Sequence, residues 1–121
     1  MRKLLLSAAT LLALSVSAHA EEKNLDFTLN NATGYDIKAV MVDPESSNQW
    51  SGNILQDPTL KNGEGSEVTF SGEASTCNWD LRVDWADDYQ PVAWKGLDLC
   101  NISEITLKYD RNSGETTAEL K

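Results

Sequence analysis

Residues 77–85, CNWDLRVDW, decide the fold. Cysteine or a large apolar residue stands at every odd-numbered position of this stretch, and a polar residue stands at every even-numbered position. Successive side chains of a strand point to opposite faces, so this period of two predicts a strand with one buried face and one solvent-facing side. A half-buried strand of this kind is typical of an antiparallel sheet.

Similar alternation, bounded by Gly, Pro, Asn and Asp residues, recurs on both sides of this stretch. The segments concerned are residues 25–29, 35–42, 67–70, 91–94, 105–109 and 116–120. No stretch has a sustained helical period. About seven short strands in roughly 100 residues predict an all-β fold, namely an antiparallel β-sandwich or a small open barrel.

Residues 1–20 have the pattern of a cleaved secretory signal peptide. A basic start is followed by an apolar run over residues 4–16 and by Ala18-His19-Ala20, a small-x-small cleavage site. The apolar run is shorter than the roughly 20 residues of a spanning helix. We therefore expect a periplasmic or secreted chain without membrane insertion after cleavage. Residues 21–24 are expected to form a flexible N-terminus, and residues 25–121 a single β domain.

The mature chain is expected to be strongly acidic. Removal of 20 of the 121 residues leaves 101, and the loss of Arg2 and Lys3 with the signal changes the formal net charge from −9 to −11. Such a chain is repelled by phosphate backbones and by anionic lipid surfaces. This charge argues against nucleic acid as a partner and favours a cation or a basic protein.

The histidine content excludes several catalytic classes. The one histidine of the chain, His19, lies in the predicted signal peptide. Histidine is the usual general base near neutral pH and the commonest metal ligand in proteins. Ser-His-Asp hydrolases, Cys-His hydrolases and His-ligated zinc sites are thereby excluded. We predict that the protein is not an enzyme and has no cofactor, with calcium as the one candidate.

Cys77 and Cys100 are predicted to form a disulfide. They are the two cysteines of the mature chain, 23 positions apart, and lack the C-x-x-C spacing of a thiol redox pair. Pairing is the default for an even number of cysteines in an exported chain. Closing this loop contributes about 3 kcal/mol to stability on the chain-entropy model.

The arrangement of several short motifs resembles that of a family of small exported bacterial proteins of uncharacterised function. The motifs are Asn31-x-Thr33-Gly34-x-x-Ile37, Trp50, Cys77-x-x-Asp80-Leu81-Arg82-Val83 and Trp94-x-Gly96-x-x-Leu99-Cys100. The resemblance covers nearly the whole mature chain and implies an exported single domain, with no known active site. Some similar chains carry the label argininosuccinate lyase, but that enzyme is large and helical, and this chain has neither property.

The acidic turn, residues 84–88, is the candidate metal site. Asp84, Asp87 and Asp88 place three carboxylates within five residues, and calcium takes six to eight oxygen ligands. No glycine-containing EF-hand loop is present. The alternative is that these carboxylates form a solvated turn between two strands, as is common in acidic proteins.

Two tryptophans are candidate binding aromatics. Trp50 lies in a polar segment and Trp94 near a glycine, where an exposed ring could stack on a sugar or anchor a protein interface. The alternative for Trp50 is that it covers an open end of the sandwich.

The leading functional hypothesis is a non-enzymatic periplasmic or secreted binding or interaction module. Its partner would be an unknown protein or glycan of the cell envelope. Three alternatives remain open at this point. They are a calcium-dependent β module with its metal at the acidic turn, an acidic inhibitor of a basic cell-wall hydrolase such as lysozyme, and a small carboxylate-based glycan hydrolase.

Overall fold

Every regular element of the computed structural model, which describes residues 22–73 and 76–121, is a β-strand. These residues form nine strands: β1 (Glu22–Asn24), β2 (Phe27–Asn31), β3 (Ile37–Pro44), β4 (Gly65–Val68), β5 (Ser71–Glu73), β6 (Asn78–Trp85), β7 (Val92–Asp98), β8 (Glu104–Asp110) and β9 (Glu115–Leu120). None of the described residues belongs to a helix that could cross a membrane. The predicted signal peptide, residues 1–20, lies outside the described part.

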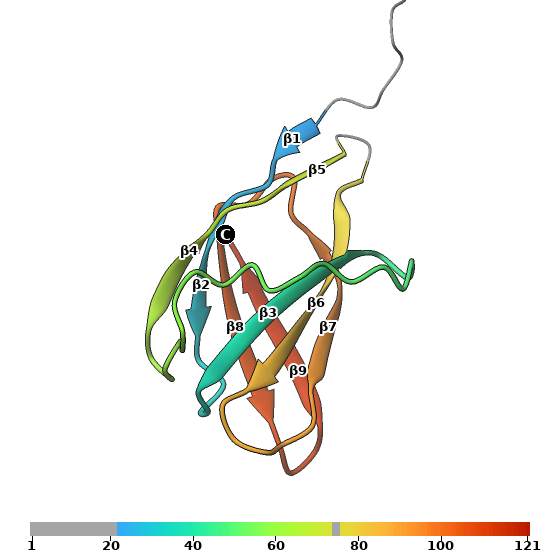
Figure 1. Ribbon diagram of the computed structural model, residues 1–121. Coiled ribbons are helices and arrows are strands. Elements are labelled where there is room, and N and C mark those ends of the chain that lie inside the picture. The colour runs from blue at the N-terminus through green and yellow to red at the C-terminus, as the bar shows by residue number, and fades with distance from the viewer. Residues whose placement is uncertain (1–21, 74–75) are drawn as a thin grey trace, which may run out of the picture.

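Seven strands form two sheets that face each other (Figure 1). One sheet has the strand order β4-β2-β8-β9 and the other has the order β3-β6-β7. β1 pairs with β5 in a separate ribbon, so most of the segment 21–24, predicted to be flexible, is in a strand. The predicted seven-stranded sandwich is confirmed. One pair, β2 with β8, is parallel, which the alternation of side chains does not reveal.

Strand β6 supplies the centre of the core. Its inward side chains, Trp79, Leu81, Val83 and Trp85, are at most 7% exposed. Buried residues of both sheets belong to the same apolar cluster: Phe27, Leu29, Val68, Ile105 and Leu107 from the four-stranded sheet, and Ile37, Val40, Val42, Trp94 and Leu97 from the three-stranded sheet. The period-two pattern of residues 77–85 therefore identifies the core side of this strand correctly.

The outer face of β6 differs from the expected solvent-facing side at Asp80. This carboxylate is 0% exposed and lies opposite Asp43 of β3, which is 2% exposed. The segment 45–49 folds over both residues, and its backbone N–H groups donate hydrogen bonds to both carboxylates. The N–H of Gly96 in β7 donates a further bond to Asp80 Oδ1 at 2.9 Å. The two carboxylates thus fix this segment to the sheet.

The outer edge of β3 is also covered, by the chain that follows this segment. The N–H of Val42 donates to Ser51 Oγ at 2.9 Å, and the N–H of Val40 donates to Asn53 Oδ1 at 2.8 Å. Leu55 then enters the core with 6% of its surface exposed. Because these side chains bind strand N–H groups, the edge is protected from pairing with another chain.

The predicted disulfide between Cys77 and Cys100 is present. Cys77 precedes β6 and Cys100 follows β7, and their Cα atoms are 5.1 Å apart. The N–H of Leu99 donates to the carbonyl oxygen of Cys77 at 2.9 Å, which continues the pairing of the two strands up to the bridge.

Candidate functional site

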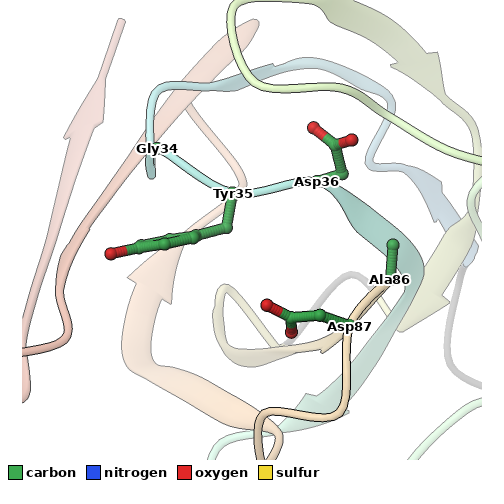
Figure 2. A pocket seen from close by; sticks show the side chains of 5 residues that line it. All are labelled: Gly34, Tyr35, Asp36, Ala86 and Asp87. Carbon is green, nitrogen blue, oxygen red and sulfur yellow. The ribbon is translucent and has the colours of Figure 1, made fainter.

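Three connections meet at one end of the sandwich, the lower end in Figure 1. They are the β2–β3 turn, the β6–β7 loop and the β8–β9 hairpin. The first two frame a hollow of about 370 Å³ that is open to solvent and lined by Gly34, Tyr35, Asp36, Ala86 and Asp87 (Figure 2). We refer to it as the hollow. It combines two carboxylates with an aromatic ring.

The side chain of Asn31 shapes the turn that carries Tyr35. Asn31 is 1% exposed, and its Nδ2 donates to the carbonyl oxygens of Tyr35 at 2.7 Å and Leu60 at 3.0 Å. Its Oδ1 accepts hydrogen bonds from the N–H and the hydroxyl of Thr33. Gly34 takes a φ of 93°, a value that a side chain would strain. The position of Tyr35 is therefore set by a buried polar network.

The hairpin brings Arg111 against the two loops. Its guanidinium carbon lies 3.5 Å from the ring centroid of Tyr35 and 3.9 Å from that of Tyr89, so the group lies close to both aromatic rings. Trp85 lies further away, at 5.1 Å. Nη1 and Nη2 of Arg111 donate to the two carboxylate oxygens of Asp87 at 3.0 and 3.2 Å. We call Tyr35, Trp85, Tyr89 and Asp87 the cage.

The ion pair with Arg111 favours the charged form of the Asp87 carboxyl. Hydrogen bonds from Arg111, joined by one from the N–H of Tyr89, lower the pKa of Asp87 below its ordinary value of 3.8. Asp87 is therefore negatively charged at neutral pH. A general acid in a glycan hydrolase needs a carboxyl whose pKa is raised, so this carboxyl is unsuited to that role.

A layer of aromatic rings supports the cage from within the sandwich. Trp85 stacks on Tyr109 with ring centroids 5.8 Å apart, and Tyr35 meets Trp85 edge to face at 6.0 Å. The hydroxyls of Tyr89 and Tyr109 share a hydrogen bond of 3.3 Å, which raises the pKa of Tyr109. Such packing restricts the rings to one arrangement, so the cage is preformed.

The acidic turn does not gather its carboxylates as calcium requires. Asp84 pairs with Arg82 at 3.1 Å, and both oxygens of Asp87 accept from Arg111. Asp88 is exposed and shares a separate hollow of about 220 Å³ with Asp84, Asp87 and the cation Lys38. Two of the three carboxylates are thus paired with arginines, and the metal site stays a prediction.

The close group of candidate metal ligands among the described residues lies at the disulfide, outside the acidic turn. Among the described residues, Cys77, Asp98 and Cys100 form such a group, and their sulfur and carboxylate oxygen atoms lie within 4.8 Å of one another. Both sulfurs of that group are joined in the disulfide and are not free to bind a metal. The three aspartates of the acidic turn form no such group.

The two predicted binding aromatics have different environments. Trp94 is 2% exposed and its indole N–H donates to the carbonyl oxygen of Thr117 at 3.0 Å, which ties β7 to β9. It is a core residue with no face available to a ligand, contrary to the prediction. Trp50 is half-buried in the segment between β3 and β4 and does not line the hollow.

Of the residues that form the cage and the hollow, Asp87 alone was predicted as a site residue. Tyr35 has the pattern of an inward strand residue, and Arg111 stands in a hairpin turn where a charged residue is ordinary. The one available signal was Asp87 in the acidic turn, with Tyr89 directly after that turn. Tyr35 precedes Asp87 by 52 positions, and Arg111 follows Tyr89 by 22 positions. Only the fold brings these four residues together.

Comparison with known proteins finds no matching family, no matching curated protein and no matching solved structure. The resemblance to small exported bacterial proteins therefore stays a prediction.

Proposed function

We propose that the protein is a non-enzymatic interaction module of the periplasm or the secreted space that binds a basic protein through the hollow. The observation that carries this proposal is the composition of the hollow, which is lined by Asp36, Asp87 and Tyr35. The side chains of Tyr35 and Asp87 extend to the same side, and the carboxylate of Asp36 points away from them (Figure 2). A cationic side chain gains from both groups, since carboxylates attract it and an aromatic ring binds it through the face.

The charges of the hollow favour an incoming cation. Asp87 is paired with Arg111, whereas Asp36 has no ion pair among the described residues and accepts one hydrogen bond, from the N–H of Asn62 at 3.0 Å. The recess therefore retains one uncompensated negative charge. A chain whose expected net charge is −11 also attracts a basic partner from a distance, which raises the association rate at low ionic strength.

Hen egg-white lysozyme, a basic cell-wall hydrolase, is a suitable probe. Its affinity is measured by isothermal titration for the wild type, for Asp36→Asn and for the control Glu45→Gln. Glu45 follows the far end of β3, and its side chain has no hydrogen-bond partner among the described residues. Both variants replace a carboxylate by an amide, so they change the net charge equally. We expect Asp36→Asn to weaken binding about five- to tenfold, as loss of one close charge pair does, and Glu45→Gln to weaken it less than about twofold.

Two results would contradict the proposal. Equal weakening by both variants would show that binding depends on net charge alone, without a site. Absence of binding at millimolar protein and low salt would remove a basic partner of this kind. A parallel lysozyme activity assay then separates plain binding from inhibition, because an inhibitor must lower the rate of cell-wall hydrolysis at concentrations near its dissociation constant.

A further inference from the structure

The cage is built as a binding site for a guanidinium group, and the chain supplies the group itself. Two tyrosine rings approach the guanidinium within 4 Å of its carbon, at 3.5 and 3.9 Å, and Trp85 lies at 5.1 Å. Asp87 binds both terminal nitrogens. Aromatic faces combined with a bidentate carboxylate are the features by which proteins recognise arginine.

Arg111 is an imperfect occupant of this cage. Its Nε is buried and has no hydrogen-bond partner among the described residues. A buried donor without an acceptor destabilises the arrangement that holds it, and it is uncommon in folded proteins. The cage therefore fits the terminal part of a guanidinium well, but the direction from which Arg111 enters leaves one donor unsatisfied.

Arg111 can leave the cage without disrupting a sheet. The β8–β9 pairing ends at Asp110 and Glu115, so Arg111 stands in the turn beyond the last paired residues. Its contacts in the cage are made by its side chain, which is 17% exposed. The other residues of the turn, 112–114, are exposed. A rotamer change of one side chain is enough to vacate the site.

The hollow and the cage share two residues. Tyr35 and Asp87 belong to both, so a side chain that enters the hollow reaches the same ring and the same carboxylate that hold Arg111. Asp36 also lines the hollow, with its carboxylate turned away from Tyr35 and Asp87 (Figure 2).

We propose that the cage is an exchangeable arginine site, in which Arg111 is an internal stand-in that an arginine side chain of the basic partner displaces. This inference rests on the proposed function and specifies the recognised group. It also predicts that arginine is preferred to lysine, because the planar guanidinium can stack on a ring and bind a carboxylate through two nitrogens at once. An ammonium group provides a point charge without that geometry.

The first experiment empties the cage. Arg111→Ala is titrated with N-ethylguanidinium chloride, and the indole N–H resonance of Trp85 is followed by NMR, with sodium chloride matched throughout. We expect a dissociation constant on the order of millimolar for the variant and binding at least about tenfold weaker for the wild type, in which Arg111 competes. N-ethylurea, which has the same shape without charge, is expected not to bind.

Two controls make the first experiment decisive. Asp87→Asn in the Arg111→Ala background should abolish the response, because the carboxylate is removed. If Arg111→Ala does not fold, Arg111→Gln takes its place. A folded variant that ignores N-ethylguanidinium, or that binds N-ethylurea equally well, would overturn the inference.

The second experiment tests exchange by a peptide. Acetyl-Gly-Arg-Gly-amide and its lysine counterpart are titrated into the wild type and into Arg111→Ala. We expect the arginine peptide to bind the variant about tenfold more tightly than the wild type, and more tightly than the lysine peptide binds.

The outcomes separate the two proposals. Equal affinity of the arginine peptide for both proteins, still weakened by Asp36→Asn, would refute exchange and leave the hollow as the binding site. Absence of peptide binding, together with absence of lysozyme binding, would refute the proposed function and the inference with it.

Discussion

Replacement of Asp80 by alanine tests whether the buried carboxylate holds the segment 45–49 against the sheet. Its two oxygens accept the N–H groups of Ser46 at 3.1 Å and Gly96 at 2.9 Å, and Lys95 Nζ lies 3.6 Å away. Alanine leaves both N–H groups without an acceptor. Hydrogen bonds to a charged group contribute about 1.5–3 kcal/mol each, so the two together contribute about 3–6 kcal/mol.

Two effects change this figure. The side chain of Lys95 is 68% exposed, so its ion pair with Asp80 adds at most about 1 kcal/mol. Asp43 lies directly opposite, and removal of one of two like charges in such a pair relieves repulsion. We therefore expect Asp80→Ala to lower the free energy of unfolding by about 2–4 kcal/mol, which corresponds to about 10–20 °C in the melting temperature of a domain of this size.

The pH dependence of the difference identifies the carboxylate as its cause. Burial acts to raise the pKa of Asp80, but the hydrogen bonds from Gly96 and Ser46 and the charge of Lys95 outweigh it, and the pKa lies below its ordinary value of 3.8. A lowered pKa means that the stabilisation is complete above pH 3.8 and is lost as the pH falls through the folded-state pKa. The wild type should therefore approach Asp80→Ala in stability on acidification.

Urea titrations followed by tryptophan fluorescence at pH 7 and at pH 3 measure both effects. Glu115→Ala, which removes an exposed carboxylate in β9, is the control and should change stability by less than about 0.5 kcal/mol. A loss below about 1 kcal/mol at pH 7 for Asp80→Ala, or a loss that is the same at both pH values, would refute the reasoning.

Three further results are expected. Asn31→Ala should lower the free energy of unfolding by about 2–4 kcal/mol in a urea titration, because its buried side chain forms hydrogen bonds with Thr33, Tyr35 and Leu60. The same substitution should broaden the NMR signals of Tyr35, and an unchanged spectrum would show that Asn31 does not hold Tyr35 in the hollow. Reduction of the disulfide should lower stability by about 3 kcal/mol, measured by a thermal melt with and without a phosphine reductant, and a shift under about 1 kcal/mol would show that the reduced, unfolded chain retains structure. Calcium at millimolar concentration should shift the melting temperature by less than about 1 °C relative to chelator, whereas a shift of about 10 °C would restore the acidic turn as a metal site.

Much of the fold was predictable because local patterns carry it. The alternation in residues 77–85 identifies the inward face of β6, and two cysteines in an expected exported chain predict their own pairing. Asp80 fits this alternation as a polar residue, but it is buried where the pattern predicts exposure. An aspartate can stand on a solvated face or beneath a covering segment, so the residue type does not distinguish the two. The burial of Asp80 depends on a loop that folds back over the sheet, and no local period encodes that return.

The candidate site was the least predictable part. An aspartate-rich turn looks the same in sequence whether it binds a metal or an arginine, and the outcome depends on which positive group the fold places beside it. Here the β8–β9 hairpin places Arg111 against Asp87, 24 residues earlier in the chain. Trp94 was predicted as a binding residue from its position near a glycine, but the approach of β9 buries its ring.

The sequence by itself determined that this protein is an all-β domain with one disulfide and a single histidine. Those properties follow from composition and from side-chain alternation, which act over a few residues. Only the tertiary structure decided that β2 runs parallel to β8, that Asp80 is buried and that a guanidinium is enclosed by aromatic rings at one end. Each of these depends on contacts between segments far apart in the chain, where several arrangements satisfy the same local pattern and packing of the whole core selects one.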